Sequence, residues 1–270
     1  MVQKNILVSV LINNYNNQKF LRKSIDSCLN QTYKNLEIIL FDDNSTDNSK
    51  KIIKKIKNKR LKKIFNLKKK SGSSALNQLN AINKSFLKSK GDIIFLLDSD
   101  DYFLKNKIKF FIDLFKKEKK LNFIQDNPIY FYPNKNLKVE KKLRKKLFTL
   151  HTWPYFNPTS TMVFKRNFLK KLLKDISFSN NNFKRMFFDA RAFIYIYFFE
   201  KNYMCLGKSL TVYTQNNFGD TIKNYEKKNL NWWTRRFEYH SYVKKLFFKK
   251  NKFHFKFIDY YLTYIIKFLF

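Results

Sequence analysis

The first hundred residues alternate between short apolar runs and amphipathic segments with helical spacing. We predict strands over residues 6–12, 36–41, 63–67 and 93–97, and helices, caps included, over residues 20–29, 44–57 and 71–88. A short, continuous apolar run is typical of a strand that is covered on both faces. Because such strands alternate here with helices, we predict an α/β fold with a mainly parallel sheet flanked by helices.

The alternation fades after residue 104. Helices are predicted over residues 105–117 and 185–199, with irregular, aromatic-rich segments between them. From residue 229 onward the sequence is basic, aromatic and broadly helical. The expected anchors of this part are Trp233, Phe237, Leu246 and Phe247. We therefore predict a helical, aromatic and basic C-terminal extension over residues 229–270.

The charge of the chain is extreme but ambiguous. With 56 basic and 20 acidic residues the net charge is +36, which usually indicates a nucleic acid or an anionic surface as partner. A biased coding sequence explains the same charge, because Lys, Asn, Ile, Phe and Tyr are abundant while Gly and Pro number 4 each. A basic nucleic-acid-binding protein therefore stays an alternative. The 44% of hydrophobic residues excludes general disorder.

Several features favour a reduced, cytoplasmic chain. The two cysteines, Cys28 and Cys205, cannot form a disulfide framework, and both lie in segments that we expect to be packed. Residues 1–10 lead directly into a strand-like run, without the small-residue cleavage site of a secretory signal. No stretch approaches the roughly 20 apolar residues of a membrane span. We therefore expect a cytoplasmic protein that is not integral to the membrane.

Polar and acidic loops follow three of the predicted strands. They cover residues 13–17, 41–45 and 98–101. In parallel sheets the ligand binds beyond the carboxyl ends of the strands. We therefore expect these loops, although far apart in sequence, to converge on one crevice.

The acidic run Asp98-Ser99-Asp100-Asp101 is the most informative of these loops. Three carboxylates at a strand end repel one another unless a hard cation neutralises them, and Mg²⁺ or Mn²⁺ favours one or two carboxylates plus substrate phosphates. We expect ligand contact for Asp98 and Asp100, whereas Asp101 fits equally well as the cap of the next helix.

The first two loops add groups that suit a nucleotide. A carboxylate of the Asp42-Asp43 pair can accept an N–H from a base or bind ribose hydroxyls, although N-capping of the next helix is the competing interpretation. Tyr15 offers a flat face on which a base can stack.

Two long segments resemble the nucleotide-sugar-binding half of glycosyltransferase family 2. They read VSVLINNYNNQKFLRKSIDSCLNQTYKNLEIILFDDNSTDNS and AINKSFLKSKGDIIFLLDSDDYF, and the match runs almost continuously over residues 6–104. A weaker match continues through HTWPYFNPTSTMVFKRNFL and Phe188-Asp189. The resemblance implies the GT-A fold, which is Rossmann-like, and inversion of configuration at the sugar that is transferred from a nucleotide-sugar.

The resemblance also implies a role for individual residues. Tyr15 would stack on the base, Asp43 would accept the uracil N3–H, and Asp98 would hold ribose or groups near the diphosphate. Asp100 would be the direct ligand of Mn²⁺ or Mg²⁺, and Asp189 would be the general base. The remaining donor-binding residues implied are Asn13, Asp42, Asn83 and Ser99.

The chain departs from the family pattern at two places. Phe188 stands where the family has the Glu of a Glu-Asp pair, so Asp175, Glu200 and Asp220 remain alternatives to Asp189 as the base. Tyr213-Thr214-Gln215-Asn216 stands where many members have Tyr-Arg-x-His, which removes an Arg and a His from that loop.

The resemblance thus predicts a metal-dependent, inverting transferase that moves a single sugar from a nucleotide diphosphate sugar, most simply a UDP-sugar, to a glycan or lipid-linked acceptor in cell-surface polysaccharide or lipopolysaccharide biosynthesis. Residues 1–228 would form the GT-A domain, with the nucleotide-sugar half over 1–104 and the acceptor half over 105–228. An inactive, nucleotide-sugar-binding family member is an alternative. A sugar nucleotidylyltransferase is disfavoured, because its Gly-rich first loop is missing.

The tail suggests one further partner. Lysines between residues 244 and 256 alternate with phenylalanines and tyrosines, a composition that suits the surface of an anionic membrane. The competing interpretation is that these aromatic residues pack on the domain while the lysines face water. Peripheral contact with the inner face of the cell membrane is therefore an expectation for this chain, and nucleic acid is not.

Overall fold

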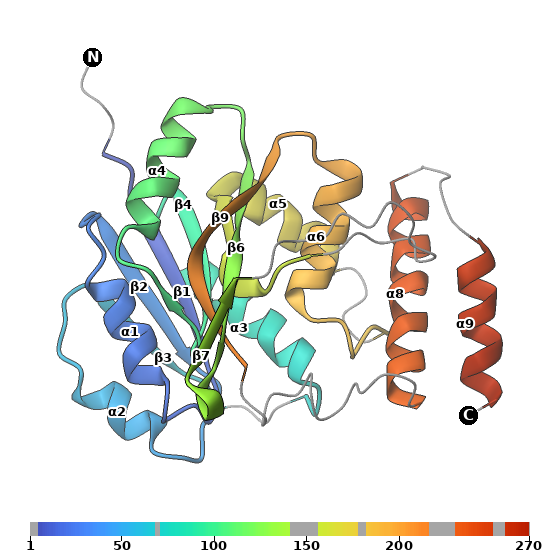
Figure 1. Cartoon of the computed structure of the whole chain (residues 1–270), viewed down its shortest axis with the longest axis horizontal. Coiled ribbons are helices and arrows are strands. Elements are labelled where there is room, and N and C mark those ends of the chain that lie inside the picture. The colour runs from blue at the N-terminus through green and yellow to red at the C-terminus, as the bar shows by residue number, and fades with distance from the viewer. Residues whose placement is uncertain are drawn as a thin grey trace.

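In a computed structural model of the chain, the described residues form one sheet of nine strands in the order β3-β2-β1-β4-β8-β6-β9-β5, with β7 paired to β6 (Figure 1). The structure describes residues 5–67, 71–140, 156–177, 182–215, 230–250 and 257–269. The strands are β1 (Val8–Asn14), β2 (Leu36–Asp42), β3 (Leu61–Phe65), β4 (Ile93–Asp98), β5 (Tyr102–Phe103), β6 (Phe123–Tyr132), β7 (Leu137–Glu140), β8 (Met162–Lys165) and β9 (Tyr203–Thr214).

Helices cover both faces of this sheet, and two further helices stand side by side beyond the helices on one of these faces (Figure 1). The helices are α1 (Leu21–Leu29), α2 (Ser49–Lys55), α3 (Ser74–Lys88), α4 (Lys107–Lys117), α5 (Arg166–Ile176), α6 (Phe188–Phe199), α8 (Leu230–Lys249) and α9 (Phe257–Leu269), with 3-10 turns η1 (Pro133–Lys135) and η2 (Thr159–Thr161). The predicted α/β class and all four predicted strands of the first hundred residues are confirmed, with ends that differ by up to two residues.

The parallel half of the sheet brings its strand ends into line. β1 pairs in parallel with both β2 and β4, which places Asn14 beside Asp42 and Asn13 beside Asp98. Residues that alternate along β1 and β4 face opposite sides: Val10 and Phe95 pack with α1, α2 and α4, whereas Leu11 and Leu96 pack with α3, α5 and α6. Burial on both faces explains why these strands appear in the sequence as continuous apolar runs.

The second half of the fold uses mixed pairing that the sequence pattern did not predict. β8 is antiparallel to β4, β6 is antiparallel to β8, and β9 is parallel to β6. These strands are interrupted by polar residues such as Asp126 and Ser209, so they lack the continuous apolar signature of the first half. The predicted helix over residues 185–199 is confirmed in shorter form as α6.

The C-terminal segment is helical, as predicted, and α8 packs on the domain. Val243, Leu246 and Phe247 of α8 belong to the same buried cluster as residues of α3, α5 and α6. The ring of Phe247 lies 4.9 Å from that of Phe198, and Phe237 stacks on Tyr260 of α9 at 5.5 Å. Of the predicted anchors, Leu246 and Phe247 are therefore core residues, while Trp233 and Phe237 are half-buried.

The cysteines also differ in their environment. Both are free; Cys28 is buried as expected, whereas Cys205, expected to be packed, is exposed on β9. No helix in the described ranges has the length and apolar character needed to cross a membrane.

A fully buried ion pair ties α4 to the mixed strands of the second half of the fold. Lys107 Nζ lies 2.8 Å from Asp126 Oδ1, and it also donates to the carbonyl oxygen of Ser160 at 3.0 Å and to the Thr211 hydroxyl. Asp126 accepts a further hydrogen bond from the backbone N–H of Leu210 at 2.9 Å. Because each polar atom of the pair has partners from several elements, the pair holds α4, β6, η2 and β9 in register.

We expect Lys107→Met to destabilise the fold by about 3–5 kcal/mol, because it leaves the Asp126 carboxylate buried and without its countercharge. The matched control is Lys109→Met on the same helix, whose exposed pair with Asp113 contributes about 0.5 kcal/mol or less. Urea unfolding at neutral pH gives both free energies. Equal unfolding free energies for the two variants would contradict this role of the buried pair.

Candidate active site

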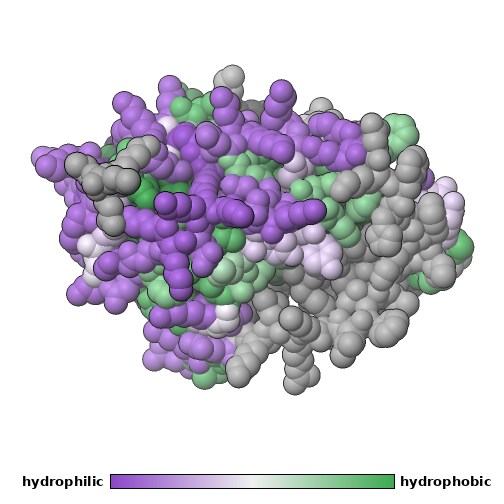
Figure 2. Space-filling model, turned by 90° about the horizontal axis from the view of Figure 1, so that it is seen from above, coloured by the Kyte–Doolittle hydropathy of each residue, from purple (hydrophilic) through white to green (hydrophobic). Residues whose placement is uncertain are grey.

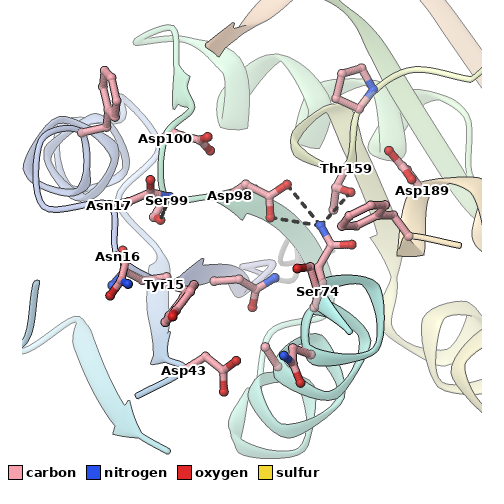
Figure 3. A pocket seen from close by; sticks show the side chains of 18 of the residues that line it. Tyr15, Asn16, Asn17, Asp43, Ser74, Asp98, Ser99, Asp100, Thr159 and Asp189 are labelled. Atoms are coloured by element: carbon pink, nitrogen blue, oxygen red, sulfur yellow. Dashed lines mark hydrogen bonds between the residues drawn. The ribbon is translucent and has the colours of Figure 1, made fainter. Parts of the chain in front are cut away.

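A cavity of about 1040 Å³ opens at the carboxyl ends of the parallel strands (Figure 3). Its walls come from the loops after β1, β2 and β4, from α3 and η2, from the start of α6 and from α8. Five carboxylates and two cations line it: Asp43, Asp47, Asp98, Asp100 and Asp189, with Lys19 and Arg235. In a chain with a net charge of +36, this concentration of acids is a local exception that requires a functional or structural reason.

The loops after β1 and β2 are clamped together. Asn16 adopts a left-handed conformation with φ of 50°, which asparagine tolerates better than most residues, and its Oδ1 accepts the backbone N–H of Thr46 at 2.8 Å. Asp47 Oδ1 accepts the N–H of Ser49, the first residue of α2, at 2.9 Å, whereas the N-cap residue Asn48 makes no side-chain cap hydrogen bond. The carboxylate that contacts the start of α2 is therefore that of Asp47.

Asp42 and Asp43 have different roles. Asp42 is buried and accepts hydrogen bonds from Asn14 Nδ2 at 2.8 Å and from Ser45 Oγ at 2.6 Å. Asp42 does not line the cavity, which corrects the prediction that it contacts the donor. Its hydrogen bonds instead stabilise the loop after β2. Asp43 lines the cavity, and its Oδ1 accepts from Asn66 Nδ2 at 2.7 Å. Neighbouring side chains at a strand end point to opposite sides, which is why only one of the pair reaches the cavity.

Tyr15 and Asp43 form one wall of the cavity. In Figure 3 both lie on one side of Asp98, and Asp189 lies on the other side. Tyr15 is 48% exposed, which leaves its ring accessible from the cavity. Asn13 and Ser99 line the same cavity, and the Ser99 hydroxyl accepts from Asn17 Nδ2 at 2.9 Å.

The acidic run after β4 divides its carboxylates between the cavity and the protein. Asp98 and Asp100 line the cavity. Asp101 is buried and accepts hydrogen bonds from Ser160 Oγ at 2.5 Å and from the N–H of Thr214 at 2.8 Å. Asp101 therefore links this loop to η2 and β9 and is not a helix cap.

The carboxylates of this run destabilise one another's charged forms. Burial and, next, the neighbouring charge of Asp100 together raise the pKa of Asp98 to about 7, although a hydrogen bond from Gln78 lowers it. Burial also raises the pKa of Asp101 well above its usual range, and the charges of Asp100 and Asp98 add to this effect. A site with this repulsion is poised to accept positive charge.

Gln78 of α3 connects two sides of the cavity, a contact that the sequence did not indicate. Its Nε2 lies 3.3 Å from both Asp98 carboxylate oxygens and 3.3 Å from Thr159 Oγ1, as the dashed lines in Figure 3 show. Its Oε1 accepts the N–H of Phe188, the first residue of α6, at 3.1 Å. One amide side chain thus joins the acidic loop to the helix that carries Asp189.

Asn83, predicted to bind the donor, lies elsewhere on α3. Four residues of α3 line the cavity, and their spacing is that of one helical face: Ser74, Asn77, Gln78 and Ala81. Asn83 comes two positions after Ala81, so the helix turns it away, and it is exposed outside the cavity. This placement corrects the prediction for Asn83.

Asp189 is the carboxylate on the opposite wall. It lies in the first turn of α6, and its pKa is raised to about 6 because burial outweighs the N–H of Ala190 and the charge of Arg235, which lower it. Phe188 points into the core against Phe164, which explains how an apolar residue is accommodated at this position. A carboxylate with a pKa near neutrality in a cavity is suited to general base chemistry.

The alternative bases lie outside this wall. Asp175 is bonded to Tyr195 and Lys250, and Glu200 accepts the N–H of Asn202; neither lines the cavity. Asp220 lies outside the described residues.

The donor set also fits a divalent cation of the kind predicted. Within the described ranges, no group of three or more His, Cys, Asp or Glu side chains is arranged to hold a metal ion. Asp98 and Asp100 nevertheless offer hard oxygen ligands and mutual repulsion that a cation would relieve. Mg²⁺ and Mn²⁺ commonly bind one or two carboxylates and complete their coordination with water and substrate phosphates.

The sequence model of the family described as "Glycosyl transferase family 2" matches residues 9–190. This chain belongs to that family. The matched range covers every cavity-lining residue named above except Arg235; Tyr213, which also lines the cavity, lies outside it as well. Glycosyl transferase family 2 was also the family that the sequence segments resembled.

Known proteins similar to this member of glycosyl transferase family 2 agree with that result. WfaP of Escherichia coli, named a UDP-Glc:alpha-D-GlcNAc-diphosphoundecaprenol beta-1,3-glucosyltransferase, is 42% identical over 113 residues, 42% of this chain and 43% of WfaP. The chain spans about half the length of the first curated relatives that it matches, between 43% and 52%.

Solved structures extend the likeness to most of the fold. Staphylococcus aureus TarS in complex with UDP has a TM-score of 0.63 and 19% identity, covering 88% of this chain and 65% of TarS. The mannosyltransferase PcManGT of Pyrobaculum calidifontis, solved with GDP-Man and Mn²⁺, has a TM-score of 0.54 and 12% identity, covering 89% and 64%. At these identities the likeness shows the fold, which is GT-A as predicted.

Proposed function

We propose that this chain transfers a single sugar, with inversion, from a nucleotide diphosphate sugar to a hydroxyl group of a glycan or lipid-linked acceptor. The observation that carries the proposal is the arrangement of one cavity, which has Tyr15 and Asp43 on one wall, Asp98 and Asp100 on the loop after β4, and Asp189 on the other wall. These three sets of groups suit, in turn, the nucleobase of the donor, its diphosphate with a metal ion, and the hydroxyl group of the acceptor.

The donor half of the proposal rests on Tyr15, Asp43 and the acidic loop. Tyr15 would stack on the base, and the Asp43 carboxylate would accept the N3–H of uracil, which makes a UDP-sugar the proposed donor. Asn13, Asp98 and Ser99 would contact the ribose and the adjoining phosphate. Asp100, with Asp98 near it, would hold Mn²⁺ or Mg²⁺, which when bound neutralises charge on the leaving diphosphate.

Asp189 would act on the acceptor. Its carboxylate would take the proton from the attacking hydroxyl while the sugar carbon is approached from the face opposite the leaving group, so that one displacement inverts the configuration. The contacts of Gln78 support the assignment of the donor to the Asp98 side and of the acceptor to the Asp189 side, because its amide group joins Asp98 to the first residue of α6. Phe156, Pro158 and Phe187 add apolar surface to the acceptor wall.

The nucleic-acid alternative is poorly supported by this cavity. Five carboxylates in the cavity would repel a phosphate backbone. On the face that Figure 2 shows, the residues on the side of α4 are mostly hydrophilic.

A direct test combines binding and transfer. Thermal unfolding of the full chain is followed with UDP, GDP and dTDP, each with and without Mn²⁺, and radiolabelled UDP-glucose is then offered with a GlcNAc-diphosphate lipid as acceptor. We expect the largest stabilisation with UDP plus Mn²⁺ and transfer that depends on both substrates. A chain that no nucleoside diphosphate stabilises, with or without Mn²⁺, would refute the proposal.

The acceptor class leads to a proposal about location. We propose that the chain works in the cytoplasm, at the inner face of an anionic membrane where a lipid-linked acceptor of cell-surface polysaccharide or lipopolysaccharide synthesis would lie. On α9, the side chains of Tyr261, Leu262 and Ile265 are each at least half exposed, and near the end of α8 Phe248 is 80% exposed between exposed lysines. Apolar side chains beside lysines suit a lipid interface.

We expect the full chain to sediment with vesicles containing phosphatidylglycerol and not with neutral phosphatidylcholine vesicles. Leu262→Ser with Ile265→Ser should reduce this binding about tenfold or more, because burying each large apolar side chain contributes on the order of 1.5–3 kcal/mol. The matched control replaces two other exposed leucines, Leu67 and Leu87, by serine. Substitution is preferable to truncation, since removing α8 would uncover the core. Equal sedimentation of both double variants would contradict lipid contact through α9.

A further inference from the structure

One cation of the cavity comes from beyond the part of the chain that matches the family. Arg235 lies on α8, 45 positions past the end of the matched range at residue 190, and its side chain lines the cavity with Phe187 and Asp189. The other lining cation, Lys19, is exposed. The helix that was predicted as an extension thus contributes a group to the candidate active site.

The Arg235 guanidinium is held in place by aromatic side chains. Its Nη2 donates to the Tyr239 hydroxyl at 2.9 Å, and the group lies 5.4 Å from the centre of the Tyr239 ring and 5.9 Å from that of Phe187. Tyr239 is itself 5% exposed. A guanidinium that is already ordered loses less conformational freedom when it binds a ligand.

The helix around Arg235 is equally well fixed. Arg185 and Glu238 form an ion pair of 2.7 Å between the segment before α6 and α8. The backbone N–H of Arg185 donates to the same Glu238 carboxylate at 2.8 Å. The position of Arg235 relative to Asp189 is therefore set by the packing of α8 and not by a mobile loop.

The described end of β9 beside this wall carries no basic side chain. Tyr213 lines the same cavity, and Thr214 and Gln215 follow it. Among the lining residues the carboxylates outnumber the cations by five to two. A diphosphate entering such a cavity meets strong repulsion unless cations face it, and Arg235 is the ordered cation on the Asp189 wall.

We propose that Arg235 binds a phosphate group of the substrate. The inference rests on the proposed function and deepens it. A guanidinium presents parallel N–H groups that match two phosphate oxygens. The phosphate has two sources, the diphosphate of the donor or the diphosphate of a lipid-linked acceptor, and the experiment separates them.

The variants are Arg235→Gln and Arg235→Lys, with Arg236→Gln as the matched control. Arg236 carries the same charge on the same helix, lies over the Trp232 ring at 5.5 Å, and does not line the cavity. Calorimetry measures the binding of UDP with Mn²⁺ and of inorganic pyrophosphate. Transfer kinetics compare a GlcNAc-diphosphate lipid with an octyl glycoside of GlcNAc, which has no phosphate.

We expect Arg235→Gln to lose at least tenfold in one phosphate interaction, with partial rescue in Arg235→Lys and no change in Arg236→Gln. Weaker binding of UDP and pyrophosphate assigns Arg235 to the donor. A tenfold higher KM for the diphosphate acceptor, with an unchanged KM for the octyl glycoside, assigns it to the acceptor.

Two outcomes would overturn the inference. In the first outcome, the parent binds UDP and transfers sugar, and Arg235→Gln has the same binding constants and KM values as the parent. If only the pH profile of the variant differs, Arg235 acts on Asp189 and not on a phosphate. In the second, the parent itself binds neither UDP nor pyrophosphate, and the proposed function fails with the inference. If Arg235→Gln unfolds early, Tyr239→Phe, which removes the hydroxyl that holds the guanidinium, takes its place with the same readouts.

Discussion

Replacing Asp100 by asparagine should abolish the stabilisation of this protein by UDP with Mn²⁺. At a ligand concentration of about 100 Kd the parent should gain about 2.7 kcal/mol in unfolding free energy, and the variant should gain almost none. The physical reason is that asparagine is isosteric with aspartate but lacks the negative charge that a hard divalent cation requires. Thermal unfolding with and without each ligand measures the difference.

The same variant should be as stable as the parent, or more stable, without ligand. The charge of Asp100 raises the pKa values of Asp98 and Asp101, so removing it relieves repulsion in the folded state. The control is Asp113→Asn, an exposed carboxylate of α4 that lies outside the cavity. If UDP with Mn²⁺ stabilises Asp100→Asn as much as the parent, the metal assignment is wrong.

Asp189→Asn should lower the rate of sugar transfer by a factor of about 10²–10⁴ and leave UDP binding nearly intact, because general base catalysis contributes about this much. Asparagine keeps the shape of the side chain but cannot accept the proton of the acceptor hydroxyl. The comparison variant is Glu200→Gln, which removes a carboxylate after α6 that does not line the cavity. Turnover of Asp189→Asn at the parent rate would show that another group is the base.

The pH dependence of transfer gives an independent measure of the same residue. A base acts when deprotonated, and burial raises the pKa of Asp189 to about 6, so the rate should rise with pH through this value and level off above it. At one pH unit below the pKa only about a tenth of the molecules hold the active carboxylate. This rise should disappear in Asp189→Asn, and a rate that is constant between pH 5 and 8 in the parent would argue against Asp189.

The nucleotide half of this fold was predictable because its signals are local. Buried parallel strands appear as continuous apolar runs, and helices appear as periodic apolar faces, so the alternation over residues 6–97 specifies the layer structure. The acids that follow β2 and β4 lie at the same sheet edge because parallel strands end together. For the four strands the prediction and the structure differ by two residues or fewer at the ends, whereas α2 begins five residues after the predicted segment, which included its cap.

The mixed strands of the second half were not predictable in the same way. β6 and β9 carry polar residues such as Asp126 and Thr211 in buried positions, where partners from distant segments satisfy them. A polar residue within a strand is predicted from sequence to lie in a loop, because its burial becomes favourable only when distant segments supply its hydrogen-bond partners.

The family, the fold class and the position of the acidic cavity were thus determined by the sequence alone. Only the tertiary structure decided that Asp43 and not Asp42 faces the cavity, and that Asn83 points away from it. It also decided that Gln78 and Arg235, more than 150 residues apart, contribute to one site. The physical reason is that periodicity and charge are local properties, whereas the direction of a side chain at a strand end and the docking of α8 depend on packing between distant segments.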